Sequence, residues 1–390
     1  MNQLPKRLKS IDIFRAITML LMIFVNDVSS VKQIPSWIEH AAASEDGLGF
    51  ADTVFPAFLF IVGLSLPFAI RSRMNKGDSV IDISVYILSR SVALLVMGFF
   101  HVNSENYNSA AVLPQAIWII AITIAFFLIW LDYPPPMAKI KKYILITTGI
   151  ILLLLMAFLY KGGTPAAPEG LRPSWWGILG IIGWAYMVCA FLFLFIKVNL
   201  PVLMVVLILF MLVNIMEHAG FLKLNLPVIG DASSVTLVMW GIVISLLYGG
   251  LSGKGKDQYL WLLFLSVGMV LIIGGLIIRP SAGGISKIHS TPAWVFICTG
   301  ISVLIFTFII WLVDIKGKQN WFTIIRPAGT STLTCYLIPY LLYSIYSLLH
   351  FHYPEFLNYG TGGLIRSIIV AVLVIILVGV MEKRRLRLKI

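Results

Sequence analysis

The sequence predicts an all-α membrane protein, a polytopic bundle of about twelve transmembrane helices with both termini on the cytoplasmic side. The chain has 390 residues, of which 59% are hydrophobic and 12% charged, and its mean hydropathy is +0.95. That composition leaves too little polar surface to cover a soluble domain of this length. Apolar runs of roughly 18 to 22 residues recur almost end to end, each long enough to cross a hydrocarbon core as a helix. The alternating pattern that a β-barrel needs is absent, so helices are the expected spanning elements.

The expected spans form a single domain over residues 1–390, because no stretch between them is long enough for a second one. The connection KVNLP, inside an expected helix pair at 175–217, is short enough to be a kink. Losing one span there would place the basic carboxyl-terminal tail outside, which the positive-inside rule disfavours. The spans cover residues 11–28, 51–70, 83–101, 112–131, 142–160, 177–197, 200–217, 235–251, 258–278, 291–313, 330–350 and 364–381.

The basic residues predict the orientation of the bundle. The formal net charge is +12, and the Lys and Arg residues cluster beside the ends of apolar runs. With a cytoplasmic amino terminus, most of them fall on one side, so orientation explains the charge and no nucleic-acid partner is expected. The amino-terminal stretch MNQLPKRLKS leads into the first apolar run without a cleavage site, so we expect that run to stay as a span. The predicted location is the inner (cytoplasmic) membrane.

The best candidate for catalysis is His40, in a short polar loop between the first two expected spans. Asn26 lies near the outer end of the first span and Asp52 begins the second, so both can approach His40 across one hairpin. An imidazole between a carboxamide and a carboxylate suits acyl or proton transfer. The simpler alternatives are a surface histidine and an aspartate that caps the second helix. Gly47 and Gly49 allow the loop to fold back tightly.

Charged residues within or beside the spans are candidates for binding an anionic ligand. Asp12 and Arg15 share one helical face at the cytoplasmic end of the first span, where they form either a salt bridge near the headgroups or an anion contact. Arg90 lies about halfway along the third span, at a depth where a cation needs a partner or a phosphate. Lys287 lies just outside the tenth span and is a candidate for an anion or sugar contact.

No metal site and no disulfide framework is expected. The cysteines Cys189, Cys298 and Cys335 lie inside apolar runs, and no histidine pair has zinc-binding spacing.

Four segments occur in an order that resembles a known family. They are RLKSIDIFRAITMLLMIFVN, HAAASEDGLGFADTVFPAFLFIVGLSL, ISKIHSTPAW and DIKG, and the likeness is densest over residues 7–70. The sequence resembles the heparan-α-glucosaminide N-acetyltransferase family and its bacterial relatives, members of the transmembrane acyltransferases. It departs from the family at Ala16, at the AAASEDG loop and at Ser331, and residues 135–235 show little likeness.

The resemblance implies an enzyme that transfers an acetyl group from cytoplasmic acetyl-CoA to the amine of a glucosamine-type sugar on the outer side. It matches His40 to the family's active-site histidine, Asn26 to the accompanying asparagine and Asp52 to the acid of the A-D-x-V-F-P stretch. Arg15 and Arg90, with Asp12 and Lys287, would bind acetyl-CoA, and the protein would be a homodimer. Direct transfer and an acetyl-histidine intermediate both stay open.

Two other functions fit the same residues. A proton-coupled transporter of a small sugar or cell-wall fragment would use Asp12, Arg90 and His40 as a relay. A relative without catalytic activity, acting as a structural or regulatory subunit, is the third hypothesis.

Overall fold

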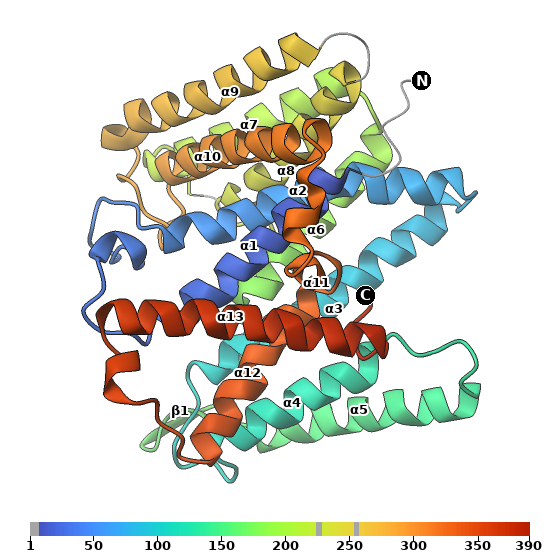
Figure 1. Ribbon diagram of the computed structural model, residues 1–390, viewed down its shortest axis with the longest axis vertical. Coiled ribbons are helices and arrows are strands. Elements are labelled where there is room, and N and C mark those ends of the chain that lie inside the picture. Colours follow the sequence, from blue (N-terminus) through green and yellow to red (C-terminus); the bar gives the residue numbers. More distant parts are fainter. Residues whose placement is uncertain (1–7, 224–227, 253–256) are drawn as a thin grey trace.

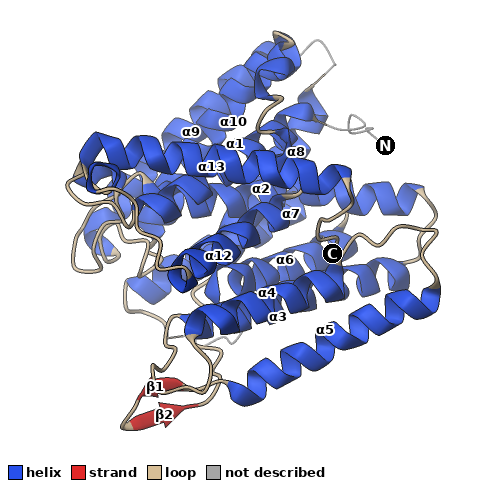
Figure 2. Cartoon of the chain, turned by 60° about the horizontal axis from the view of Figure 1, so that its bottom comes forward, coloured by secondary structure: helices blue, strands red, loops and turns tan. Residues whose placement is uncertain are grey.

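The computed structural model describes residues 8–223, 228–252 and 257–390 (Figure 1). Over these residues the chain is almost entirely helical, with one short β-hairpin that the sequence did not predict (Figure 2). The elements are α1 (Lys9–Val28), α2 (Ala51–Asn75), α3 (Val80–Ser104), α4 (Gln115–Trp130), α5 (Lys139–Leu159), β1 (Gly162–Thr164), β2 (Ala167–Glu169), α6 (Gly177–Ile196), α7 (Leu200–His218), α8 (Ser233–Leu251), α9 (Asp257–Ile278), α10 (Pro292–Ile310), α11 (Arg326–Thr330), α12 (Thr332–Leu348) and α13 (Gly360–Lys383).

Every predicted span coincides with a helix. Within the described residues, 9 helices are long and apolar enough to cross a membrane, namely α2, α3, α5 to α10 and α13. The helices α4 and α12 are apolar but shorter, and α1 carries Lys9, Asp12, Arg15 and Asp27. The chain is therefore a multi-pass membrane protein, and the count of about twelve spans stays a prediction.

The predicted pair near 177–217 consists of two separate helices. α6 ends at Ile196 and α7 begins at Leu200. Lys197 between them has φ of 60°, a left-handed conformation that an uninterrupted helix does not contain. Asn199 then caps α7 by accepting a hydrogen bond from the backbone N–H of Val202. The short connection is a turn.

The loops predicted to share a side of the membrane do meet at one end of the molecule. Those predicted to lie outside are joined by backbone bridges from Lys32 to Tyr359 and from Tyr107 to Gly162, and by an ion pair between Asp46 and Arg279.

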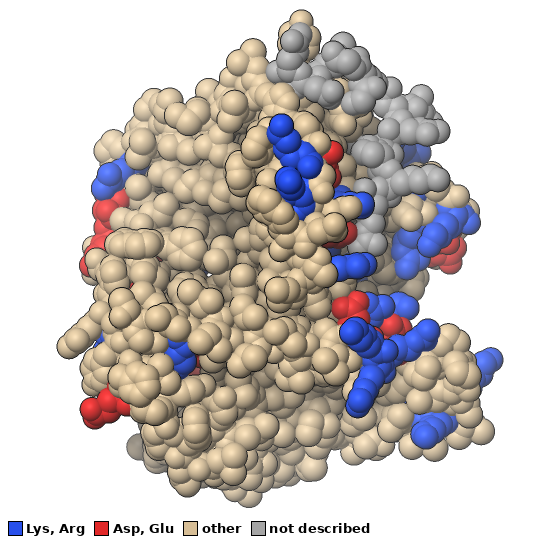
Figure 3. All heavy atoms as spheres, in the orientation of Figure 1, with Lys and Arg blue, Asp and Glu red and all other residues tan. Residues whose placement is uncertain are grey.

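The segments predicted to lie inside meet at the opposite end. There Asp132, after α4, binds Arg387 and Lys389 of the carboxyl-terminal tail. Leu8 and Ile390 line the same pocket, so the two ends of the described chain lie together. Lys and Arg residues gather near this end in Figure 3. The basic segments at 1–7 and 253–256 lie outside the described residues. The assignment of this end of the molecule as the cytoplasmic end stays a prediction.

The centre of the bundle depends on close contact between α2 and α8. A Cβ atom on Gly63 would lie 1.9 Å from the carbonyl oxygen of Val238, and one on Gly241 would lie 2.1 Å from that of Phe60. Neither position can hold a larger residue unless a helix moves. Small residues at such positions allow membrane helices to approach each other closely. The outer helices α5 and α7 expose most of their apolar side chains, as expected for lipid contact.

A buried ion pair ties α1 to α13 near the His40 end of the bundle. The Asp27 carboxylate accepts hydrogen bonds from Arg366, from Ser367 at 2.7 Å and from the hydroxyl of Tyr343 at 2.8 Å. Asp27 and Arg366 are 3% and 5% exposed. Such a pair needs all of its hydrogen bonds to offset the loss of water. Asp27 was not among the residues predicted from the sequence, although it is next to Asn26.

Breaking this pair on one side should destabilise the protein strongly. We expect Arg366→Met to lower the free energy of unfolding by about 3 to 5 kcal/mol, because it leaves a buried carboxylate without its cation. The thermal unfolding midpoint in detergent measures the effect. Arg172→Met, which removes an exposed ion pair with Glu169, is the matched control and should change the midpoint little. Equal midpoints for both variants would contradict a structural role for the Asp27 and Arg366 pair.

Candidate functional site

The His40 imidazole lies against Asp52 at the start of α2. The distance from His40 Nδ1 to Asp52 Oδ1 is 2.6 Å. Asp52 is 2% exposed, whereas the His40 side chain is 40% exposed, so the carboxylate is enclosed while the imidazole can be reached. A carboxylate this close to Nδ1 is satisfied when Nδ1 carries the proton, which leaves the lone pair on Nε2. That tautomer makes Nε2 the available base or nucleophile.

Asp52 also fixes the shape of the loop that carries His40. Its Oδ2 accepts hydrogen bonds from the backbone N–H groups of Ala41 at 3.0 Å and Gly49 at 3.1 Å. Asp52 is the second residue of α2 and not its N-cap, which is Phe50. The predicted capping role is therefore replaced by one in which the carboxylate holds the two ends of the loop together. Because that carboxylate accepts two backbone N–H groups besides His40, it has little freedom to rotate.

Gly49 is the position where the loop cannot accept a side chain. A Cβ atom there would lie 1.8 Å from the carbonyl oxygen of Glu39. A Cβ on Gly47 would meet nothing within 4 Å, and the backbone N–H of Gly47 instead donates to Ile285. Of the two predicted glycines, Gly49 provides the close approach that places His40 above α2.

Lys287 lies beside His40, at the opposite end of the molecule from the other predicted acetyl-CoA ligands. Its Nζ atom is 3.2 Å from Nδ1 and 3.5 Å from Nε2 of the imidazole. Burial lowers the pKa of Lys287, and the nearby Asp52 carboxylate opposes that shift. The sequence predicted an anion or sugar contact, and the structure places this amine at the candidate catalytic centre.

An ion pair holds the Lys287 loop against the His40 loop. Arg279 Nε lies 2.9 Å from Asp46 Oδ2, and the backbone N–H of Ile285 donates to Asp46 Oδ1 at 2.7 Å. These two hydrogen bonds lower the pKa of Asp46 below its usual range. We name Asp46 and Arg279 the loop clamp. The clamp could not be predicted from the sequence because its residues are more than two hundred positions apart.

Asn26 is not joined to His40 by any contact that the structure shows. The residue is exposed near the end of α1, and within the described chain its side chain makes no hydrogen bond to His40 or Asp52. Its predicted role at the catalytic centre stays a prediction.

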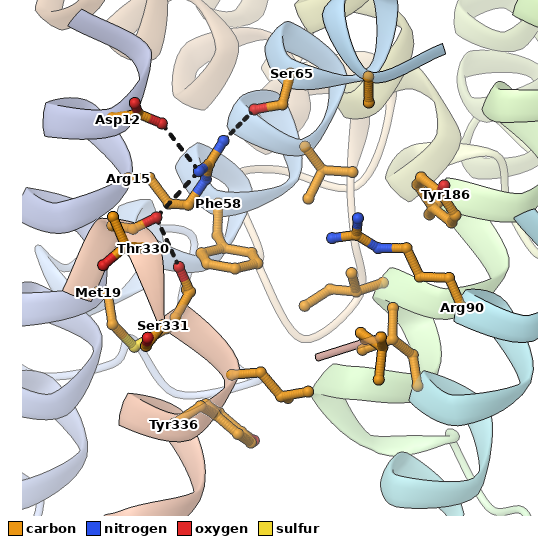
Figure 4. A pocket seen from close by; sticks show the side chains of 18 of the residues that line it. Asp12, Arg15, Met19, Phe58, Ser65, Arg90, Tyr186, Thr330, Ser331 and Tyr336 are labelled. Carbon is orange, nitrogen blue, oxygen red and sulfur yellow. Dashed lines mark hydrogen bonds and ion pairs between the residues drawn. The ribbon is translucent and has the colours of Figure 1, made fainter. Parts of the chain in front are cut away.

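A cavity of about 570 Å³ opens at the other end of the bundle, between α1, α2, α3, α6 and α12. Arg15 and Arg90 line it from opposite sides, as Figure 4 shows. Arg15 is held by Asp12 at 3.3 Å, by the carbonyl oxygen of Gly329 at 3.1 Å and by Ser65. The structure thus confirms the predicted contact between Asp12 and Arg15 and places both residues in the wall of the pocket.

Arg90 is the cation of this pocket that no described carboxylate neutralises. Its Nη1 atom donates to the hydroxyl of Tyr86 at 3.1 Å, and its guanidinium carbon lies 5.1 Å from the centre of the Tyr186 ring. Its Nε atom is buried without a hydrogen-bond partner among the described residues. A guanidinium held in this way inside a membrane bundle suits an anionic ligand such as a phosphate.

The pocket and His40 are separate in this structure. The pocket ends toward His40 at Met22 of α1 and Phe58 of α2. Along α2, Phe58 is six residues from Asp52, or about 9 Å of helix. No group of three or more His, Cys, Asp or Glu residues in the described part of the chain is placed to bind a metal ion.

Fold and site together define a multi-pass helical membrane protein with a histidine and carboxylate centre at one end and a cation-lined pocket at the other. A model for a domain of unknown function, DUF5009, matches residues 7–167. The human heparan-alpha-glucosaminide N-acetyltransferase is 38% identical over 107 residues, and the mouse enzyme is 36% identical over 101. These alignments cover 27% and 26% of this chain but only 15% and 14% of the relatives. The predicted resemblance to the heparan-α-glucosaminide N-acetyltransferases is confirmed for the aligned residues.

Opening the loop clamp should impair the His40 centre without unfolding the bundle. We expect Arg279→Ala to lower the rate of a reaction that depends on His40 about 10-fold or more, because misplaced catalytic groups lose their orientation. Thermal unfolding should change little, since the side chains of both partners are about half exposed. Arg172→Ala, at another exposed ion pair, is the control for the rate measurement. Full activity in Arg279→Ala would show that the clamp does not position the centre.

Proposed function

We propose that this protein is a transmembrane acetyltransferase of the inner membrane. It would take an acetyl group from acetyl-CoA at the end where Leu8 and Ile390 lie, the cytoplasmic end in this proposal. It would pass the group to the amine of a glucosamine-type sugar at the His40 end, on the outer side. The observation that carries the proposal is the 2.6 Å contact between His40 and Asp52. The similarity to heparan-alpha-glucosaminide N-acetyltransferases supports the reaction type.

The pocket is the proposed donor site. Arg90 would pair with a phosphate of acetyl-CoA, and Arg15, held in place by Asp12, would bind a second anionic group. The inner wall at Met22 and Phe58 is apolar, which suits the uncharged arm that carries the thioester. That arm would need to pass between α1 and α2 to reach His40. It would have to span the roughly 9 Å of helix that separates Phe58 from Asp52.

At the His40 end, Nε2 would act on the acceptor amine. In direct transfer the amine nitrogen forms a bond to the acetyl carbon, the carbon–sulfur bond breaks, and Nε2 takes the proton released by the amine. In the second route Nε2 itself carries the acetyl group before passing it on. Both routes require the lone pair on Nε2 that the bond to Asp52 favours. Asn26, near the end of α1, would donate a hydrogen bond to the oxyanion.

The first test is CoA release by purified protein in detergent. A transferase should release CoA from acetyl-CoA when glucosamine is present, because the reaction needs no sealed compartment. A transporter would release none, since transport requires two separated compartments. No release over a panel of amino sugars would contradict the proposal. A homodimer, as in the family the sequence resembles, is part of the proposal and is tested by the mass of the detergent-solubilised particle.

Removing either member of the His40 and Asp52 pair should abolish most activity. We expect His40→Ala and Asp52→Asn each to lower kcat by about 10²- to 10⁴-fold, the usual contribution of a positioned base. His352→Ala, at an exposed histidine of another loop, is the control and should retain wild-type kcat. The assay is CoA release at saturating acetyl-CoA and glucosamine. Wild-type kcat in Asp52→Asn would rule out the proposed orienting role.

Arg90 should affect donor binding more than chemistry. We expect Arg90→Ala to raise KM for acetyl-CoA about 10- to 100-fold, because a hydrogen bond to a charged group is worth roughly 1.5 to 3 kcal/mol. KM for glucosamine should not change. Lys141→Ala, which removes an exposed cation at the amino-terminal end of α5, is the matched control. An unchanged KM for acetyl-CoA in Arg90→Ala would show that the pocket is not the donor site.

A further inference from the structure

The nearest amine to the candidate catalytic centre belongs to the protein itself. Lys287 Nζ lies 3.2 Å from Nδ1 and 3.5 Å from Nε2 of His40. An acceptor amine attacking an acetyl group activated by His40 has to come within similar reach of the same imidazole. Lys287 therefore occupies the region in which the amine of a substrate would react.

The position of Lys287 is fixed by contacts outside its own side chain. The loop clamp holds Ile285 against Asp46, and the backbone N–H of Ser286 donates to the hydroxyl of Thr291 at 3.0 Å, just before α10. With both flanks of the loop held, the backbone of Lys287 stays beside the His40 loop. Proximity of this kind can replace a large part of the entropy that a free amine loses on binding.

The surroundings of Lys287 also favour the neutral amine that acylation requires. The side chain is partly buried, and burial lowers its pKa below the ordinary lysine value. The nearby Asp52 carboxylate limits that shift. Asp52 is already occupied by His40, Ala41 and Gly49, and no hydrogen bond joins it to Lys287 in the described structure. The amine is thus close to the imidazole without being held as one half of an ion pair.

We propose that Lys287 is a site of self-acetylation, modified by the protein's own donor when no sugar acceptor is bound. The inference rests on the proposed acetyltransferase function and assigns Lys287 as an internal acceptor at its centre. The Nζ lone pair forms a bond to the acetyl carbon, and the carbon–sulfur bond of acetyl-CoA breaks. The proton lost by Nζ passes through His40 to the departing sulfur, so the products are Nε-acetyl-lysine and CoA. A bound sugar prevents the reaction by occupying the same region.

Mass spectrometry of the purified full-length protein tests this assignment. The protein is incubated with acetyl-CoA alone, with acetyl-CoA and glucosamine, and with acetyl-CoA as the His40→Ala variant. Peptides containing Lys287 are compared with those containing Lys32 and Lys161, two exposed lysines of loops predicted to share its side of the membrane. We expect Lys287 to be acetylated about 10-fold faster than either control lysine, because its amine is already in place. Glucosamine and His40→Ala should both remove this preference.

The pH dependence separates an assisted reaction from ordinary chemical acetylation. The rate of acetylation at Lys287 should rise with pH and level off below the ordinary lysine pKa of about 10.4. The lowered pKa of Lys287 makes the neutral amine available at a lower pH. The acetyl group on Lys287 should survive acid treatment that cleaves an acetyl-imidazole, which distinguishes it from acetyl-histidine.

Two results separate failure of this inference from failure of the proposed function. Glucosamine-dependent CoA release with Lys287 acetylated no faster than Lys32 and Lys161 would overturn the self-acetylation site and leave the transferase intact. Absence of both CoA release and selective acetylation would overturn both. Selective acetylation of Lys287 that persists in His40→Ala would also contradict the proposal, because the lysine would then react without the imidazole.

Discussion

The candidate site depends on the hydrogen bonds that the Asp52 carboxylate accepts. It accepts hydrogen bonds from His40, Ala41 and Gly49, and its backbone carbonyl accepts one from the indole of Trp294 in α10 at 3.1 Å. One residue thus fixes the imidazole, closes the loop and joins α2 to the helix that follows Lys287. Burying a carboxylate with fewer hydrogen-bond donors would cost free energy of folding. The geometry of the candidate site and the stability of the local fold therefore depend on the same hydrogen bonds.

The bundle places two candidate sites at its opposite ends. Arg15 and Arg90 line the pocket that Leu8 and Ile390 also line, whereas His40, Lys287 and the loop clamp lie at the opposite end. The glycine contact between α2 and α8 packs the central helices tightly, and the peripheral helices α5 and α7 turn their apolar side chains outward. A reaction with a charged donor on one side and a polar acceptor on the other suits this division, because neither ligand has to cross the hydrocarbon core.

The sequence predicted the helices well because hydrophobic length is a local property. Each expected span became a helix, and the positions of His40 and Asp52 in neighbouring elements correctly implied contact across one hairpin. Contacts between distant segments were not readable in the same way. The clamp between Asp46 and Arg279, the pair of Asp27 with Arg366 and the approach of Lys287 to His40 all depend on how loops meet after the helices pack. The β-hairpin at 162–169 escaped notice because its strands have only three residues each.

The proposed transfer of an acetyl group across the membrane is tested most directly in proteoliposomes in which the orientation of the protein is known. Acetyl-CoA is supplied on the side of the Arg90 pocket and glucosamine on the His40 side, then the two are exchanged, and N-acetylglucosamine is measured in each compartment. We expect product only in the first arrangement and only on the His40 side. Product formed when both substrates are confined to one side, or movement of unmodified glucosamine across the membrane, would contradict it.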